Sequence, residues 1–547
     1  MPPLDFEPTV PQFLRHVTER FGERRLISLG ERRLGYAEAE AESARLACGL
    51  LARGVGKGTR VGVLFGNGPD WVISWLAAAR IGALVVPINT FYQARELGWT
   101  LRHADIHTLL TTARLLSHDY QERLEQCAPS LRSQKASRQI LACPELPCLR
   151  QVFVFGGDPR AWASSVDALR EAGDAQPGID AALLREVEAA VCPADALVVI
   201  YSSGSTAEPK GAVHTHGVML RQAHGLNRYR DATPDDRIWS PMPFFWVGGL
   251  VVSLLQNMNV GASLLCQDAF EPGETLAMLE RERATSALGW PQYMQAMRDH
   301  PDFARRDLSS LNSSFPEQLA QGESPPDMQL RSNSLGMTET CGPHTYDRMD
   351  VDLPESLRGS FGRAVEGVEH KVIDPETGEI LAPGEHGEIC VRGRNLMQGL
   401  YKREREDVFD ADGFYHTGDA GHFDAEGYLF FKARLGEMIK TGGANVTPRE
   451  VEVVVEEQPE VQSCFVVGVP HPHRGQNVAA AIVLNEGAAL SPDELRLRLR
   501  NELSAYKLPR HVFFCTRDEL PFTDSGKIQK AELARILGER VAESEPG

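Results

Sequence analysis

The segment YSSGSTAEPKGAVHTH, residues 201–216, directly follows the apolar run ALVVI and is rich in serine, threonine and glycine. Small hydroxyl side chains and glycine after a buried strand present N–H and O–H donors to an oxyanion, and a lysine adds positive charge. The order Pro-Lys-Gly does not fit a P-loop, which needs Gly-Lys-Ser/Thr at a helix start. We therefore predict a phosphate-binding loop of another nucleotide fold, with a helix-capping polar turn as the alternative. The predicted phosphate ligands are Ser202, Ser203, Gly204, Ser205, Thr206 and Lys210.

The sequence before this loop alternates between strand-like and helix-like runs, such as RVGVLFGN (60–67), PDWVISWLAAARIG (69–82) and ALVVPIN (83–89). Short β-branched runs joined by helical segments predict parallel strands with crossover helices. The alternation is lost between about residues 125 and 180, where we expect a surface excursion. After the loop, residues 355–431 are divided by glycines into alternating segments, which predicts antiparallel hairpins.

The C-terminal region contains two sequence patterns that are typical of the first turn of a helix. Thr447-Pro448-Arg449-Glu450 and Ser491-Pro492-Asp493-Glu494 each place a hydroxyl residue, a proline and a glutamate in the order of a capping box. Apolar residues then recur at helical spacing, and the strand-like runs CFVVGVP and AAAIVL lie between the two starts. This pattern predicts a small α/β domain that begins near KARLGEMIKTGG (432–443).

Composition limits the functions that are open to the chain. It has 547 residues and a formal net charge of -18, which disfavours a nucleic-acid-binding surface. Its ten cysteines are scattered without metal-ligand spacing, so we expect reduced thiols and a cytoplasmic protein. The N-terminus lacks the features of a secretory signal. The most apolar window, which starts at Val247, is interrupted by Gln256, Asn257 and Asn259, so no transmembrane segment is predicted.

Five motifs, in this order, resemble signatures of the adenylate-forming superfamily, which includes acyl-CoA synthetases, adenylation domains of peptide synthetases and luciferases. They are YSSGSTAEPKG (201–211), SLGMTET (334–340), YHTGDAG (415–421), RLGEMIKTGGANVTPREVE (434–452) and LPFTDSGKIQK (520–530). The resemblance implies an α/β fold with a large N-terminal AMP-binding domain, residues 1–433, of doubly wound α/β subdomains and a small β-rich subdomain. It also implies a small, mobile α/β C-terminal domain, residues 434–547, with a hinge near Gly436.

The resemblance also implies ATP, Mg²⁺ and CoA as reactants and cofactors, and roles for individual residues. A carboxylate is a poor electrophile, so it is first converted to an acyl adenylate, a reaction that needs neutralisation of phosphate charge. Lys527 would bridge the substrate carboxylate and the α-phosphate, Thr338 would contact the α-phosphate, and Asp419 would bind the ribose hydroxyls. The remaining implied residues are Leu335, Gly336, Met337 and Arg434 for the nucleotide, Glu339 and Thr206 for Mg²⁺, and Gly436, Lys440, Gly442 and Gly443 for the hinge and CoA.

The chain departs from the family pattern at several positions. Ala207 stands where glycine is usual in the phosphate loop, Leu335 replaces an aromatic residue that stacks on adenine, and Trp246 replaces a common histidine. Gly436 replaces a common aspartate. SLGMTET resembles the family's adenylate-binding motif and YHTGDAG its ribose-binding motif. A Gly-rich loop that normally precedes the adenylate motif is replaced by SSFPEQLAQGESPPDMQL (313–330). The adenine contacts are therefore the assignment that the motifs support least.

The resemblance points to CoA as acceptor and to a small-molecule carboxylic acid as substrate. The hinge segment and VVGVPHPHRGQNVAAAIV (466–483) resemble acyl-CoA synthetases more than adenylation domains of peptide synthetases. The expected acyl pocket is apolar, which disfavours an amino acid and leaves fatty, alicyclic and aryl acids open. Transfer to an amine or a carrier protein and an inactive nucleotide-binding relative are the alternatives, and a homodimer is also left open. The expected pocket residues are Phe245, Trp246, Val247, Gly248, Trp290 and Met294.

Overall fold

The structure is a computed structural model in which the chain divides into two compact units. The first comprises Met1–Thr90, Thr100–Tyr201 and Gly211–Ala433, and the second comprises Phe91–Trp99, Ser202–Lys210 and Arg434–Gly547. The side chains of Pro291, Gln292, Met328, Ala433 and Arg434 are not described. The structure describes residues 4–136, 140–202, 209–311, 319, 327–348, 351–435, 438–522 and 528–544.

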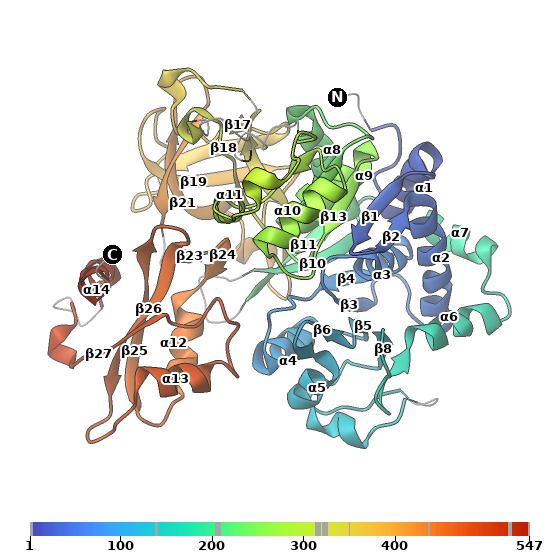
Figure 1. Ribbon diagram of the computed structural model, residues 1–547, viewed down its shortest axis with the longest axis horizontal. Helices are drawn as coiled ribbons and strands as arrows, with labels where there is room; N and C mark the ends of the chain where they lie inside the picture. The colour runs from blue at the N-terminus through green and yellow to red at the C-terminus, as the bar shows by residue number, and fades with distance from the viewer. Residues whose placement is uncertain are drawn as a thin grey trace. The chain divides into compact units, whose positions relative to one another are not determined.

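The largest sheet has eight strands in the order β20-β11-β10-β4-β3-β5-β8-β9. Its strands from β11 to β8 are labelled in Figure 1. Neighbouring strands from β10 to β9 run parallel, with Val61 of β3 opposite Val85 of β4 and Thr108 of β5. The predicted parallel α/β sheet is therefore confirmed. Its strands are β3 Arg60–Leu64, β4 Leu84–Pro87, β5 Thr108–Thr112, β8 Gln151–Phe155, β9 Ser164–Ser165, β10 Ala196–Ser202, β11 Lys210–Thr215 and β20 Gly399–Leu400.

The expectation of a surface excursion between residues 125 and 180 was wrong. β8 lies in this stretch and pairs along its full length with β5, with Leu109 opposite Val152 and Leu110 opposite Phe153. Helix α6, Val166–Ala175, also lies there and packs on helix α2, Tyr36–Ala52. The stretch therefore extends the central sheet and covers part of it.

A second sheet has the strand order β14-β12-β13-β1-β2. All its neighbours are parallel except β1 and β2, which form an antiparallel pair. Two parallel-strand sheets with helices match the doubly wound subdomains implied by the resemblance. The strands are β1 Arg25–Leu29, β2 Arg32–Gly35, β12 Arg237–Trp239, β13 Ser263–Cys266 and β14 Ser286–Ala287.

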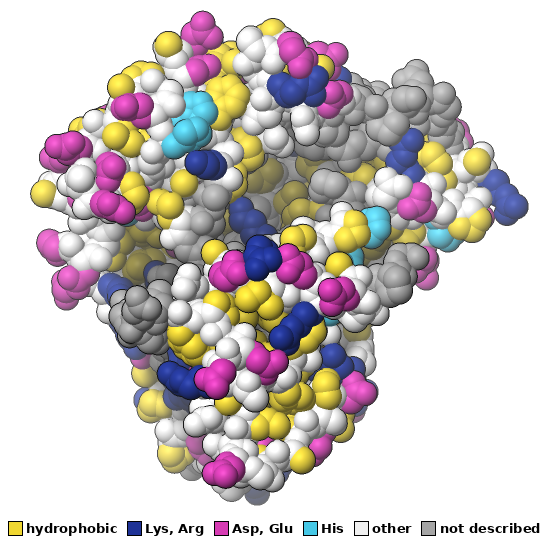
Figure 2. Space-filling model, turned by 90° about the vertical axis from the view of Figure 1, so that its left-hand side faces the viewer, with side chains coloured by type: hydrophobic (Ala, Val, Ile, Leu, Met, Phe, Trp, Pro, Cys, Tyr) yellow, Lys and Arg dark blue, Asp and Glu magenta, His cyan; other side chains and the backbone are white. Residues whose placement is uncertain are grey.

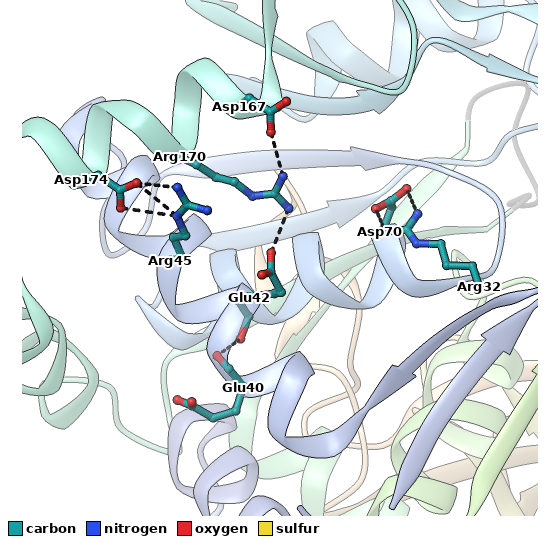
Figure 3. A network of polar contacts seen from close by, with 9 residues as sticks. Arg32, Glu40, Glu42, Arg45, Asp70, Asp167, Arg170 and Asp174 are labelled. Carbon is teal, nitrogen blue, oxygen red and sulfur yellow. Dashed lines mark hydrogen bonds and ion pairs between the residues drawn. The ribbon is translucent and has the colours of Figure 1, made fainter. Parts of the chain in front are cut away.

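The helices of this first unit pack closely on one another. Gly49 of α2 and Gly173 of α6 bring the two backbones together, since a Cβ on Gly49 would lie 2.3 Å from Leu169 O. Ion pairs at the edge of this contact join Arg45 to Asp174 at 2.6 Å (Figure 3). The α-helices before residue 330 are α1 Val10–Phe21, α2, α3 Pro69–Arg80, α4 Ala94–His103, α5 Tyr120–Cys127, α6, α7 Ala181–Ala189, α8 His216–Leu226, α9 Gln256–Val260, α10 Pro272–Arg281 and α11 Pro291–Arg298, with a π-helix, η3, at Gly248–Leu255. The first six residues of α4 belong to the second unit.

Residues 335–434 form antiparallel strands, and the glycine pattern predicted such strands for the part between residues 355 and 431. A three-stranded sheet has the order β15-β16-β17, and a four-stranded sheet has the order β18-β19-β21-β22. All pairs for which the register is defined are antiparallel. The strands are β15 Leu335–Met337, β16 Gly342–Tyr346, β17 Arg363–Ala364, β18 Val368–Ile373, β19 Gly387–Gly393, β21 Tyr415–Phe423 and β22 Leu429–Arg434.

The C-terminal part of the second unit is a small α/β structure around a long hairpin, β25 Val461–His471 and β26 Gly475–Leu484. Helices α12, Pro448–Glu456, and α13, Pro492–Leu499, pack on one face, and α14, Lys530–Ser544, packs on the other (Figure 1). Both predicted helix starts are present, with Thr447 N donating to Glu450 Oε1 at 2.7 Å and Glu494 N donating to Ser491 Oγ at 3.2 Å. The shorter strands are β23 Ile439–Thr441, β24 Ala444–Val446 and β27 His511–Phe514.

The charged side chains, the cysteines and the helix lengths can be compared with what the composition indicated. Acidic and basic side chains are interspersed on the face drawn in Figure 2. All ten cysteines are free thiols. Among the helices of the described residues, none combines the length and apolar character that crossing a membrane requires.

Candidate functional site

The predicted phosphate loop leaves the carboxyl end of a parallel strand. Ser202 is the last residue of β10 and Lys210 is the first residue of β11, and both are half-buried. Ligand-binding loops of open α/β sheets lie at this end of the strands. The other predicted ligands, Ser203, Gly204, Ser205 and Thr206, lie outside the described residues, as does Ala207.

The adenylate motif SLGMTET, residues 334–340, forms β15 and most of the turn that leads into β16. Gly336 of β15 faces Gly342 of β16 so closely that a Cβ on Gly336 would lie 2.5 Å from Gly342 O. Only glycine fits this approach, which accounts for its position in the motif. The turn is closed by Thr340, whose Oγ1 donates to Gly342 O at 2.7 Å. Cys341 at its end has a φ of 57°, a value that few non-glycine residues adopt.

The turn of this hairpin is fixed through three successive carbonyl groups. The carbonyl of Thr338 accepts a hydrogen bond from His214 Nε2 at 2.7 Å. The next carbonyl, that of Glu339, accepts from Met397 N at 2.8 Å, and that of Thr340 accepts from Asn395 Nδ2 at 3.2 Å. The carbonyl of each of these three residues thus accepts a hydrogen bond. The side chains of Thr338 and Glu339, which are half-buried, therefore project from a backbone that is fixed in place.

His214 provides the shortest of these three contacts and is fully buried in β11. Its partner is a carbonyl oxygen, so Nε2 must carry the proton and donate it. Burial lowers the pKa of His214 to about 4, which keeps the imidazole neutral at physiological pH. The adenylate motif is therefore anchored by a neutral donor on the strand that follows the phosphate loop.

The motif YHTGDAG, which is expected to bind the ribose, lies on β21, where Asp419 is buried. Thr417 Oγ1 donates to Ile389 O of β19 at 2.6 Å and accepts from Asp419 N at 3.0 Å. Gly418, with a φ of 70°, donates its N–H to Glu388 Oε1 at 3.0 Å. The backbone before Asp419 is thus held by β19, and Ala420 after it pairs with Glu388 of the same strand. A carboxylate with this fixed main chain suits two adjacent hydroxyl donors.

The expected acyl-pocket residues follow two neighbouring parallel strands of the second sheet. Phe245, Trp246, Val247 and Gly248 come after β12, and the segment from Trp290 comes after β14, with Trp239 opposite Ala287 in the pairing. Asn67 holds the first segment, because its Oδ1 accepts from Phe244 N at 2.8 Å and its Nδ2 donates to Met242 O at 2.7 Å.

These pocket candidates differ in exposure. Phe245 and Met294 are buried, and Met294 belongs to a core cluster with Trp239. Trp246, Val247, Gly248 and Trp290 are half-buried, so they are the members of the set with surface available to a ligand.

The hinge and CoA candidates are only partly described. Gly442 and Gly443 form the two-residue turn between β23 and β24, with φ values of 57° and 85°. Positive φ at both residues is the geometry of a type I′ hairpin turn, which explains the pair structurally. Lys440 is exposed on β23. Gly436 and Lys527 lie outside the described residues, and Arg434 ends β22 with its side chain not described.

The three residues implied for the adenine side of the nucleotide lie together on β15. Leu335 is buried in the main core cluster, and Gly336 and Met337 continue the same strand. The segment that replaces the Gly-rich loop lies largely outside the described residues. The sequence did not reveal His214, Asn395, Met397, Asn67 or Glu388 as supports of the site, because each acts through contacts with distant segments.

Comparison with known proteins places these features in one family. The pattern of the AMP-binding enzyme family matches residues 14–401, and that of its C-terminal domain matches residues 450–527. The putative acyl-CoA synthetase YngI of Bacillus subtilis is 30% identical over 96% of both chains. A feruloyl-CoA synthase of Amycolatopsis is 33% identical over 92% of this chain and 94% of its own. The amide bond synthetase McbA of Marinactinospora thermotolerans has a similar structure, with a TM-score of 0.77, 25% identity and coverage of 96% of this chain and 99% of its own.

Proposed function

Because this chain belongs to the AMP-binding enzyme family, we propose that it converts a carboxylic acid to its CoA thioester through an acyl adenylate. A carboxylate oxygen attacks the α-phosphorus of ATP, and the bond from that phosphorus to pyrophosphate breaks. The thiol of CoA then attacks the acyl carbonyl carbon, the bond from that carbon to AMP breaks, and the thiol proton passes to solvent. The products are acyl-CoA, AMP and pyrophosphate.

The observation that carries this proposal is the anchored turn of residues 338–340. Three consecutive carbonyls are held by hydrogen bonds of 2.7, 2.8 and 3.2 Å, so the Thr338 hydroxyl and the Glu339 carboxylate extend from a main chain that is hydrogen-bonded at each residue. Catalysis of phosphoryl transfer depends on groups that are fixed before the reaction. Thr338 would donate to the α-phosphate, where negative charge develops.

The donor set also fits Mg²⁺, which prefers carboxylate oxygen and usually keeps several waters. Glu339 offers a half-buried carboxylate beside the turn, and the Thr206 hydroxyl is the second proposed ligand. When bound, Mg²⁺ would neutralise charge on the phosphates. Ser202 to Thr206 with Lys210 would hold the β- and γ-phosphates, Asp419 and Arg434 the ribose side of the nucleotide, and Leu335, Gly336 and Met337 its base.

Residues 434–547 are proposed as a domain that changes position relative to residues 1–433, with Gly436 as the hinge. One pose would present Lys527 to the carboxylate and the α-phosphate, and the other would present Lys440, Gly442 and Gly443 to CoA. The boundary between the two compact units, at Ala433 and Arg434, supports this division. The ten free thiols support a reducing compartment, and we place the enzyme in the cytoplasm.

The proposed acid carries an uncharged fatty, alicyclic or aryl group. The half-buried members of the expected pocket are Trp246, Val247, Gly248 and Trp290, none of which is charged. An apolar wall with two indole rings favours an apolar or aromatic acid and offers no partner for an ammonium group. The relative named feruloyl-CoA synthase gives the aryl acids particular support.

Transfer of the acyl group to an amine is the second candidate. It is favoured by the fold similarity to an amide bond synthetase, which reaches a TM-score of 0.77 over 96% of this chain. Both candidates share the adenylation step and differ only in the nucleophile that attacks the adenylate.

A panel of acids, assayed for pyrophosphate and AMP with and without CoA, tests the proposal. We expect pyrophosphate release with at least one apolar acid, and continuous turnover to acyl-CoA only when CoA is present. Turnover with simple amines and no CoA would support the second candidate. An absence of pyrophosphate with every acid would reject both.

A further inference from the structure

A partly buried arginine lies beneath the π-helix that adjoins the proposed acyl pocket. Arg230 follows α8 and a short 3-10 turn, and no carboxylate of the described residues forms an ion pair with it. Burial lowers the pKa of Arg230 to about 10, while nearby Asp236 acts in the opposite direction. The side chain thus remains a cation at neutral pH and is solvated by neutral groups.

Those neutral groups are three side-chain amides, from Asn227, Gln256 and Asn257, all buried. Arg230 Nε donates to Asn227 Oδ1 at 3.0 Å. The Gln256 amide has hydrogen-bond partners for both its oxygen and its nitrogen in one orientation, and in that orientation its oxygen accepts from Arg230 Nε at 3.2 Å. Arg230 Nη2 donates to Asn257 Oδ1. A guanidinium has donors only, so it draws the three amide oxygens toward itself and turns the three NH₂ groups away.

Each of the three NH₂ groups then donates to a main-chain carbonyl. Asn257 Nδ2 donates to Ser253 O at 2.6 Å, the Gln256 nitrogen donates to Val252 O at 3.0 Å, and Asn227 Nδ2 donates to Gln256 O at 2.9 Å. Two of these carbonyls belong to the π-helix η3 and the third to α9. We call Arg230 with Asn227, Gln256 and Asn257 the amide cage.

The amide cage acts where η3 changes from π to α geometry. Gln256 N bonds to Val251 O, five residues back, and the chain then continues as the α-helix α9. Such a change of repeat leaves carbonyls near the junction without a regular main-chain donor, and π-helical turns are rare in proteins. The cage supplies donors at this junction. It also explains the polar residues Gln256 and Asn257 inside an otherwise apolar run.

The other end of η3 is built into the proposed acyl pocket. Leu250 N donates to Trp246 O at 2.9 Å, and a Cβ on Gly249 would lie 1.9 Å from Pro243 O. Further along, Val252 Cγ2 lies 3.9 Å from the position that a Cβ on Gly342 would take, next to the adenylate motif. Loss of the one-residue π insertion would rotate one part of the helix against the other by about 100°.

We propose that Arg230 is a positioning residue for acid recognition, which holds η3 in π geometry through the amide cage and thereby fixes Trp246 and Val252. This inference rests on the proposed function. It assigns to Arg230 an effect on the choice and affinity of the acid, with little effect on ATP or CoA.

The test compares Arg230→Met and Arg230→Lys with a matched control, Arg228→Met. Arg228 lies two residues away and pairs with Glu366 on the surface. In R230M we expect the KM for the preferred acid to rise about tenfold, as is typical for the loss of one member of a hydrogen-bonded network, and the KM for ATP to stay within about twofold. R230K keeps a cation without the planar fork, so it should recover part of the loss. R228M should match the wild type.

A second variant and a second measurement cover the case in which R230M folds poorly. Asn257→Asp keeps an oxygen for Arg230 and adds a compensating charge, but it cannot donate to Ser253 O. Its acid KM should also rise. Amide hydrogen exchange of residues 248–260, measured without substrates, should accelerate in R230M and N257D and remain unchanged in R228M.

Two results would overturn the inference. One is a folded R230M with the acid profile and KM of the wild type. The other is an equal rise in the KM values for acid and ATP that R230K does not reduce, which would indicate general damage. A wild-type enzyme that activates no acid would instead reject the proposed function and this inference with it, while the exchange data would still show whether the cage holds η3.

Discussion

Replacing His214 with phenylalanine tests how the adenylate motif is held. The substitution keeps an aromatic ring in a fully buried position and removes the donor that reaches the Thr338 carbonyl at 2.7 Å. A buried acceptor left without its donor costs about 1–3 kcal/mol of the free energy of unfolding. H214F should therefore be less stable than the wild type by this amount at pH 8, where the imidazole is neutral.

The difference should depend on pH in a defined direction. The folded-state pKa of His214 is lowered from 6.5 to about 4, so the unfolded chain takes up a proton first as the pH falls. The contribution of a neutral His214 is complete above pH 6.5 and is lost as the pH approaches 4. Linkage over these two pKa values gives a loss of about 2 kcal/mol in the wild type by pH 5, and phenylalanine contributes no such loss. The gap between the two proteins should thus close between pH 8 and pH 5.

Urea unfolding followed by tryptophan fluorescence measures this gap. All seven tryptophans lie between residues 71 and 290, so the signal reports on the region before residue 434. Other buried histidines, such as His216 and His370, titrate equally in both proteins and cancel in the comparison. If the difference in the free energy of unfolding between the two proteins stays constant or widens as the pH falls, His214 is not a neutral, buried donor.

The other predictions concern the two half-reactions and the acid. Lys527→Ala should slow adenylation by about 100-fold or more, because two anions then approach without a cation between them, while thioester formation from a presynthesised adenylate continues. An equal loss of rate in both half-reactions would contradict a role of Lys527 that is specific to adenylation. Trp246→Ala should shift the substrate preference toward larger acids, measured as the relative activity with a series of acids of increasing size. If these relative activities do not change, Trp246 serves only in packing. Gly436→Pro should hold φ at about -65° and trap residues 434–547 in one of the two proposed positions, so that one half-reaction survives and the other fails. Wild-type rates in both, assayed separately, would exclude Gly436 as the hinge.

Local patterns in the sequence were sufficient for much of the fold. The capping boxes at Thr447 and Ser491 predicted α12 and α13, because helix starts are set by contacts within four residues. Glycine-divided segments likewise predicted the antiparallel strands β18 to β22. β8 was missed because its five residues lie in a stretch rich in proline and cysteine, and its stability comes from pairing with β5.

The supports of the candidate site could not be predicted in the same way. His214 and Thr338 are 124 positions apart, and nothing in the local pattern around either indicates their hydrogen bond. The same holds for Arg230 and Asn257, whose contact stabilises a π-helix that no periodicity suggested. Motifs identify the residues that we propose to face the ligand, whereas the residues behind them are specified only by tertiary packing.

The most direct test of the adenylate mechanism is the fate of carboxylate oxygen. An acid labelled with ¹⁸O in both carboxylate oxygens is incubated with enzyme, ATP, Mg²⁺ and CoA, and the products are analysed by mass spectrometry. If the carboxylate attacks the α-phosphorus and CoA then displaces AMP at the carbonyl carbon, AMP gains one ¹⁸O and acyl-CoA keeps one. Unlabelled AMP, or ADP with ¹⁸O in inorganic phosphate, would contradict the account.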